Sequence, residues 1–411
     1  MKKIAFVLMI AVVLASVMLV MSSCKEESVT TLYVYNWGEY ISDGSEGTLD
    51  VNAEFEKYYL ETYGEQIKVN YSTFSSNESL YDKISSGAVK YDVIIPSDYM
   101  IERMINEGLL AKLNFENIPN YQTIHPDFKG QNVYYDPDNL YSVPYTYGMV
   151  GVIYNTVLVE ENDSDIGSWS LMWDSDYAGN ILQFNNSRDA FGTALYYLGY
   201  DVNDASEEQW REALELLKEQ KEIVQGYVMD EIFNKMASNS AAISAYYAGD
   251  YLTMYGDNEN LAFYYPKEGT NIYIDAMCVP ASSENQLIAE RYINFMLSEE
   301  IAVANAEYTC YASPNTVVTQ NAEYQEYMAS IHPDAMNILY NEEHPVKTIF
   351  YENLSREKLT MLNSLWEELK IDSSIGNSFY IICGVLVAFI SAFALYYIIR
   401  QKKRAKYYEN L

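Results

Sequence analysis

Several residue types and motifs are scarce in this chain of 411 residues, and each shortage excludes a class of function. Only three His and four Cys are present, and neither CxxC nor HExxH occurs, so the usual ligand groupings of a zinc site are missing. The phosphate-cradling patterns GxGxxG and GxxxxGKS/T are absent, and so is the GxSxG nucleophile elbow. We therefore expect no cofactor, no metal and no enzymatic activity.

Positive charge is also scarce. The 26 Lys and Arg stand against 58 Asp and Glu, and the net charge is −32. The acidic excess lies between Cys24 and Asp372, because both ends of the chain are basic. A field of this sign repels nucleic acid and attracts cations, although part of it serves solubility. By contrast there are 41 Tyr, a side chain whose flat face and hydroxyl suit ligand grooves as well as half-buried surfaces.

The N-terminal segment is nearly free of charge after Lys2 and Lys3. A basic start, an apolar run and small residues at its end are typical of a secretory signal, which we place at residues 1–23. The sequence MSSC that ends at Cys24 resembles a bacterial lipobox, which predicts lipidation of Cys24. The alternative is an incidental Cys beside an ordinary cleavage site, or a signal that is never removed.

A second uncharged stretch lies near the C-terminus. Residues 373–399 contain no charged side chain, and a run of this length can cross a bilayer of about 30 Å. We predict a transmembrane helix at 377–399, followed by a basic tail at 400–411 that the positive-inside rule places in the cytoplasm. The intervening part then lies on the extracellular or periplasmic face. A buried core helix is the alternative.

Two cysteines remain in the exported part, Cys278 and Cys310. Exported proteins form disulfides, but two Cys in a sequence do not establish one, so their pairing stays open.

The middle of the chain alternates short strands with amphipathic helices, which predicts an α/β fold with a parallel sheet. Strands are expected at 31–36, 67–71, 91–96, 149–154, 181–184, 241–247, 261–265 and 273–280. Helices are expected at 51–62, 78–86, 100–107, 207–222, 286–298, 300–307, 323–330 and 355–369. Ligands of such sheets bind beyond the carboxyl ends of the strands, where Trp37 and Ser97 fall.

Several short motifs occur in a fixed order along the exported part. They are YVYNWGEY at 33–40, YDVIIPSDY at 91–99, SVPY at 142–145, AYYAGD at 245–250, YPKEG at 265–269, ID at 274–275 and YASPN at 311–315. In this order they resemble the spermidine/putrescine-binding proteins of polyamine ABC transporters, a family of bacterial extracellular solute-binding proteins. The resemblance covers residues 31–370, and single motifs would be weak without the others.

The resemblance implies a periplasmic-binding-protein fold with a ligand cleft between two lobes. Lobe 1 would comprise 31–146 and a return segment at 276–318, lobe 2 would comprise 147–275, and helices at 319–370 would pack on lobe 2. Crossover strands are expected near 145–149 and 273–277. The implied partners are a small polyamine, an ABC permease with its ATPase, and the membrane, but no nucleic acid.

A polyamine requires carboxylates for its ammonium groups and aromatic walls for its methylenes. The resemblance implies such contacts at Trp37, Tyr40, Ser97, Tyr99, Asp189, Tyr247, Asp250, Tyr273, Asp275, Tyr311 and Glu352. Each has a structural alternative in a Tyr-rich, acidic chain: a Tyr or Trp37 can fill a core, and the acids can be solvated. Asp98 can cap the following helix instead of binding ligand.

The chain departs from the family pattern at residues 185–189, NNSRD. Asn186 stands where spermidine binders have an acid, and Asp189 stands where they have Glu. Asp250 resembles an acid of putrescine-preferring relatives, and Glu352 aligns only roughly with an amide. The preferred polyamine therefore stays open. We expect Arg188 to form a structural ion pair within its loop.

Other functions remain open at this stage. A receptor for iron, thiamine or a sugar belongs to the same class, and Tyr clusters suit iron. An exported enzyme is a third hypothesis, although the three His lie outside the cleft motifs. A sensor ectodomain is a fourth, although the tail at 400–411 is too short for a signalling domain.

Overall fold

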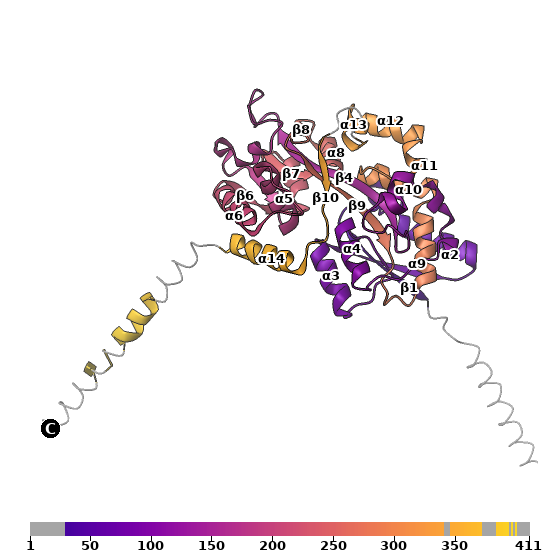
Figure 1. The fold of residues 1–411 in the computed structure, drawn as a ribbon, viewed down its shortest axis with the longest axis horizontal. Helices are drawn as coiled ribbons and strands as arrows, with labels where there is room; N and C mark the ends of the chain where they lie inside the picture. Colours follow the sequence, from indigo (N-terminus) through magenta and orange to yellow (C-terminus); the bar gives the residue numbers. More distant parts are fainter. Residues whose placement is uncertain (1–28, 341–345, 372–383, 394–395, 398, 401–411) are drawn as a thin grey trace, which may run out of the picture.

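The computed structural model describes residues 29–340, 346–371, 384–393, 396–397 and 399–400. Its centre is a ten-stranded sheet (Figure 1). Eight strands follow the order β2-β1-β3-β9-β4-β7-β5-β6, and the other two, β10 and β8, pair with β9 and β4. The strands are β1 (Thr30–Trp37), β2 (Ile67–Phe74), β3 (Val93–Ile94), β4 (Ser142–Asn155), β5 (Ile181–Phe184), β6 (Val224–Val228), β7 (Ile243–Tyr247), β8 (Leu261–Tyr264), β9 (Thr270–Cys278) and β10 (Thr348–Phe350).

The long strands β4 and β9 join the two sides of the sheet. They pair antiparallel from Ser142 opposite Cys278 to Met149 opposite Ile272, with a register shift between Pro144 and Thr146. On one side β1, β2 and β3 run parallel to one another, and on the other β5, β6 and β7 do so. In Figure 1 the helices α2, α3, α4 and α9 lie around the first set, and α5 and α6 lie around the second.

Helices fill the connections. They are α2 (Val51–Tyr63), α3 (Asn77–Ser86), α4 (Asp98–Asn106), α5 (Ser187–Leu198), α6 (Glu207–Lys221), α7 (Glu231–Ala237), α8 (Ala248–Asp257), α9 (Gln286–Met296), α10 (Glu299–Thr309), α11 (Thr316–Thr319), α12 (Ala322–Ile331), α13 (Ala335–Tyr340) and α14 (Arg356–Lys370). Local sequence explains their starts: Ser206 and Gln209 form a capping box at α6, and Asp50 caps α2. The apolar face of α6 carries Trp210, Leu214 and Leu217, as its spacing predicts.

The hydrophobic interior is divided between the two sides of the sheet. Phe55, Tyr59 and Tyr292 belong to a cluster beneath β1 and β2, and a second cluster on that side contains Tyr35 and Ile101. On the other side one large cluster contains Trp169 and Trp210. That cluster also takes in side chains of α12, α13 and α14, so the C-terminal helices pack against the β5–β7 side.

Most predicted elements occur within a few residues of their expected bounds, but four strands differ in length. The strand expected at 91–96 is reduced to β3, although the amides of Asp92 and Ile95 also donate to main-chain carbonyls of β1. The strand expected at 67–71 continues to Phe74, because β2 pairs with β1 as far as Trp37. The strand expected at 149–154 begins at Ser142, and the one expected at 273–280 begins at Thr270, since β4 and β9 pair along their whole shared length. The sequence did not predict the helices α5, α7, α8, α11 and α13 or the strands β6 and β10.

Cys278 and Cys310 are both buried and are not bonded to each other. The predicted signal at 1–23, the proposed lipidation site Cys24 and tail residues 401–411 lie outside the described residues. Among the described residues, no helix combines the length and apolar character that crossing a bilayer requires. Residues 384–393 of the predicted span 377–399 are helical, whereas 377–383, 394–395 and 398 are not described.

Candidate functional site

A cavity opens where the two sides of the sheet face each other, and it encloses about 850 Å³ of space, including the part open to solvent. Its walls come from the carboxyl ends of parallel strands on both sides. Trp37 ends β1 and Phe74 ends β2, while Asn186 and Met229 follow β5 and β6. This is the position at which open α/β sheets bind ligands. Ten of the eleven predicted contact residues line it, namely Trp37, Tyr40, Ser97, Tyr99, Asp189, Tyr247, Asp250, Tyr273, Asp275 and Tyr311.

Asp275 lies near the middle of β9 with 4% of its surface exposed. Its Oδ2 accepts a hydrogen bond of 2.7 Å from the Tyr40 hydroxyl, which is also bonded to Thr146 Oγ1. Among the described residues its other oxygen, Oδ1, has no hydrogen-bond partner. Burial raises the pKa of Asp275 to about 6, although the bond from Tyr40 works in the opposite direction.

The same pairing of a carboxylate with a tyrosine hydroxyl recurs three times. Tyr247 donates to Asp189 Oδ2 at 2.7 Å, and Tyr311 donates to Asp250 Oδ2 at 2.8 Å. Tyr99 donates to Glu78 Oε1 at 3.1 Å and itself accepts from Asn77. In each pair the hydroxyl orients the acid without neutralising it, so the carboxylate keeps further acceptor sites. The four pairs are built on the starts of α3, α5 and α8 and on β9.

The lining is strongly unbalanced in charge. It contains seven acids against one base, Arg188; the acids are Glu39, Glu78, Asp98, Asp189, Asp230, Asp250 and Asp275. Burial raises the pKa of Asp250 to about 8, and it also raises the pKa values of Glu78, Asp98, Asp189 and Asp230. Ionised acids in such a place are unfavourable unless a cation joins them. The site therefore suits a positively charged ligand.

Aromatic rings form the remaining walls. The rings of Trp37 and Phe74 lie 4.5 Å apart, those of Tyr40 and Tyr311 lie 4.9 Å apart and perpendicular, and those of Tyr247 and Tyr273 lie 5.4 Å apart. Faces and edges of this kind can hold methylene groups and attract ammonium groups.

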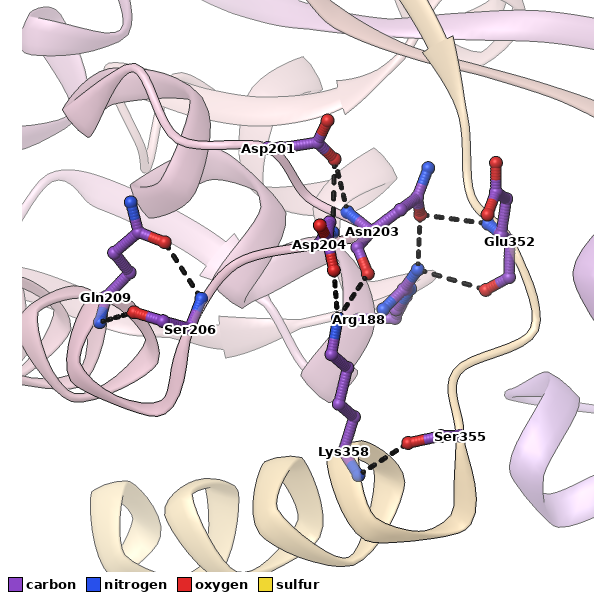
Figure 2. Close-up of polar contacts among 9 residues, drawn as sticks. All are labelled: Arg188, Asp201, Asn203, Asp204, Ser206, Gln209, Glu352, Ser355 and Lys358. Atoms are coloured by element: carbon purple, nitrogen blue, oxygen red, sulfur yellow. Dashed lines mark hydrogen bonds and ion pairs between the residues drawn. The ribbon is translucent and has the colours of Figure 1, made fainter.

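Among the residues that the structure describes, Arg188 has no ion-pair partner, so the expected ion pair within its loop is wrong. Its Nη2 donates to Asn203 Oδ1 at 3.0 Å and to the carbonyl of Glu352 at 3.2 Å (Figure 2). Its guanidinium lies 4.5 Å from the centre of the Tyr351 ring. Neutral acceptors and a ring thus hold this cation at the edge of the cavity. The acids nearby are left available to a ligand.

Glu352, the eleventh residue predicted to contact the ligand, does not line the cavity. Its side chain is exposed, whereas the preceding residue, Tyr351, is buried and lines the wall. The main chain of Glu352 instead exchanges bonds with Arg188 and Asn203 (Figure 2). The segment after β10 approaches the cavity from a short parallel strand, whose register the sequence did not reveal.

Asp98 is the first residue of α4, and its carboxylate is used by the fold. Oδ1 accepts from the amide of Tyr99 at 2.7 Å, and Oδ2 accepts from the amide of Ile274 at 3.2 Å. The N-cap of α4 is Ser97 and not Asp98, so the expected capping role is wrong. The Asp98 carboxylate instead ties the first turn of α4 to β9.

Several lining residues were missed by sequence reasoning, among them Glu78, Asp230, Phe233, Asn271 and Tyr351. Asn271 could have been predicted from the sequence, because every second residue of a strand lies on the same face and Asn271 therefore shares a face with Tyr273 and Asp275. A carboxylate cluster close enough to share a metal ion among the described residues, Asp163, Asp165 and Asp174, lies outside the cavity lining.

Comparison with known proteins identifies the family. Residues 52–331 match the family described as bacterial extracellular solute-binding protein. The chain belongs to this family. A spermidine/putrescine-binding periplasmic protein of Salmonella typhimurium is 30% identical over 326 residues, which are 78% of this chain and 88% of the relative. The resemblance inferred from the motifs is thereby confirmed, and the family consists of solute-binding proteins and not of enzymes.

Solved structures agree. A putative spermidine/putrescine ABC transporter protein from Listeria monocytogenes has a TM-score of 0.74 and 34% identity, and the match covers 83% of this chain and 99% of that one. A spermidine/putrescine ABC transporter substrate-binding protein from Streptococcus pneumoniae has a TM-score of 0.63 and 32% identity, with coverage of 83% and 98%. The expected α/β periplasmic-binding-protein fold is confirmed.

Proposed function

We propose that this protein captures a polyamine, spermidine or putrescine, outside the cytoplasm and delivers it to an ABC permease. The observation that carries the proposal is the cavity itself, where four tyrosine–carboxylate pairs face aromatic walls and the acids outnumber the single base. Relatives with about a third of their residues in common are named as binders of the same polyamines.

The chemistry of the ligand fits this lining. Ammonium groups donate hydrogen bonds to the free carboxylate lone pairs of Asp275, Asp189, Asp250 and Glu78, and the tyrosine hydroxyls hold these acids in place for such charge-assisted bonds. Methylenes lie against the rings of Trp37, Tyr247 and Tyr273. We assign ligand contact to the ten predicted residues that line the cavity and withdraw it from Glu352.

Capture by closure follows from the position of the cavity. We retain the proposed division into lobe 1 at 31–146 and 276–318 and lobe 2 at 147–275, with 319–370 packed on lobe 2. The separate hydrophobic clusters support it, although Ala306 and Val318 of the return segment pack with the cluster of lobe 2. Ligand bridging both lobes stabilises the closed form, which docks on the permease and its ATPase.

Anchoring at both ends is part of the proposal. A secretory signal at 1–23, lipidation of Cys24 and a membrane helix at 377–399 with a cytoplasmic tail rest on sequence patterns. A doubly tethered receptor stays at high local concentration near its permease. A truncation ending at Asp372 should therefore transport polyamine more slowly at equal expression, and equal transport would contradict the role of the C-terminal anchor.

A thermal-shift panel tests the choice of ligand. Putrescine, spermidine and spermine should raise the melting temperature, whereas thiamine, a neutral sugar and ferric citrate should not, because they do not present ammonium groups spaced along an apolar chain. A shift with iron or thiamine alone would replace the polyamine by that ligand.

A further inference from the structure

Three side chains of β9 share an unusual property. Asn271, Tyr273 and Asp275 alternate along one face of the strand, all three line the cavity, and their exposed fractions are 3%, 8% and 4%. Within the described part of the chain, Asn271 Oδ1, the Tyr273 hydroxyl and Asp275 Oδ1 are buried and have no hydrogen-bond partner. One face of β9 thus carries three buried polar atoms without a partner among the described residues, all on residues that line the cavity.

Such atoms are concentrated at this site. Of the ten buried side-chain atoms without a partner among the described residues, six belong to residues that line the cavity. Folded proteins pair nearly all buried polar groups, because an unpaired one forfeits its hydration. Several unpaired polar groups along the wall of a binding cavity are explained if a bound ligand supplies their hydrogen-bond partners.

We propose that Asn271 binds the ligand and selects for polyamine length, favouring the triamine spermidine over the diamine putrescine. The inference rests on the proposed function. It adds Asn271 to the ligand-binding residues, and the family resemblance does not include this residue. Asn271 and Asp275 are four positions apart on an extended strand, so their Cα atoms are separated by about 13 Å. Tyr273 lies between them on the same face.

The ligand chemistry follows this order. An ammonium group binds the open oxygen of Asp275, the methylenes cross Tyr273, and a further amine donates to Asn271 Oδ1. A diamine held at Asp275 ends before it reaches Asn271, whereas a triamine continues. The Asn271 side chain adds a hydrogen-bond acceptor without adding a buried charge. Strand β9 also contacts helix α5, which carries the acid Asp189.

Substitution of Asn271 separates this role from a structural one. Asn271→Leu has nearly the same size and no polar atom, so it removes the acceptor and leaves no protein group unpaired. In the full chain purified in detergent, we expect spermidine affinity to fall by about tenfold or more, because a hydrogen bond to a charged amine is lost. Putrescine affinity should change little, and the melting temperature without ligand should not fall.

Two further variants complete the test by calorimetry. Asn271→Asp keeps an acceptor at the same place and should retain more spermidine affinity than Asn271→Leu. Ile272→Val lies on the other face of β9, outside the cavity lining, and should leave the affinities for both polyamines unchanged.

The outcomes distinguish this inference from the proposed function. A selective loss for spermidine in Asn271→Leu, with unliganded stability maintained, supports the assignment. Equal losses for both polyamines, no loss for either, or a lowered unliganded melting temperature in Asn271→Leu would overturn it while leaving polyamine binding by the native chain intact. Absence of binding of either polyamine to the native chain would overturn both.

Discussion

The Tyr40 hydroxyl donates a hydrogen bond of 2.7 Å to Asp275 Oδ2, and this bond joins the loop after β1 to the middle of β9. It holds one oxygen of the carboxylate, and among the described residues the other, Oδ1, has no hydrogen-bond partner. Because Asp275 is buried, its charge is costly until a cation approaches. The pair therefore acts as a fixed receptor for an ammonium group.

Replacing Asp275 with Ala should lower polyamine affinity by at least about tenfold, because a charge-assisted bond contributes more than a neutral one. Isothermal calorimetry measures the change. Glu259→Ala, an acid on the surface outside the cavity lining, serves as the control and should bind as the native chain does. Native affinity in Asp275→Ala would remove this residue from the site.

Stability without ligand should fall as the pH rises from about 4 to 8. Burial raises the pKa of Asp275 to about 6 and that of Asp250 to about 8, from an ordinary value of 3.8. The folded chain therefore holds protons that the unfolded chain has released, so this stabilisation is complete below pH 4 and is lost through pH 6 and then 8.

Melting curves at pH 5 and pH 8 check this dependence. Spermidine should raise the melting temperature more at pH 8, where it joins ionised acids, and Asp250→Asn should flatten the dependence between pH 6 and 8. A melting temperature that rises steadily from pH 5 to 8 without ligand would show that these acids are not the dominant titrating groups.

Gly249→Ala should weaken ligand binding and lower the melting temperature. A Cβ atom at Gly249 would lie 2.5 Å from Cδ2 of the Tyr311 ring, and that ring carries the hydroxyl bonded to Asp250. Overpacking of this kind costs about 1–3 kcal/mol. Gly226→Ala is a matched control, since no atom lies within 4 Å of its added Cβ. Equal behaviour of the two variants in calorimetry and melting would contradict the close approach.

Asn203→Ala should destabilise the fold by about 1–3 kcal/mol in denaturant titrations. Asn203 accepts hydrogen bonds from Arg188 and from the amide of Glu352 (Figure 2). It also donates to the carbonyl of Phe350. The substitution leaves the buried guanidinium with fewer acceptors.

Lys358→Ala provides the comparison, because it removes an ion pair of 2.9 Å with the exposed Asp204 and a hydrogen bond from the same Nζ to the main-chain carbonyl of Asn203. Such a pair contributes at most about 1 kcal/mol. If Lys358→Ala lowers the free energy of unfolding more than Asn203→Ala does, the hydrogen bonds of Asn203 stabilise the segment after β10 less than the contacts of Lys358 do.

Site residues could be predicted from the sequence where a local motif also contains a side chain suited to the ligand. Trp37 and Ser97 could be placed because each comes directly after a strand expected from the sequence, at 31–36 and 91–96, and Asp275 because aligned motifs surround it. Asn271 was missed because the expected strand began two residues later, at Tyr273, and the alternation was therefore not extended backward. Glu78 was missed because its partner Tyr99 belongs to another helix, and such a pairing depends on tertiary contact.

The errors have a similar origin. Arg188 was expected to pair with an acid of its own loop, but its acceptors come from Asn203 and from the chain after β10. Glu352 was predicted to contact the ligand and its neighbour Tyr351 was not, because the register of β10 against β9 depends on sheet pairing and not on sequence periodicity. Long-range partners of this kind leave no pattern in a single sequence.

Calorimetric titration of residues 25–372 with putrescine, spermidine and spermine tests the central claim most directly. This segment contains every residue of the three hydrophobic clusters and the whole cavity. We predict saturable binding of one polyamine per chain, with affinity that falls as salt is added. Absence of both heat and thermal stabilisation with all three polyamines would contradict the account and assign the acidic cavity to another small cation.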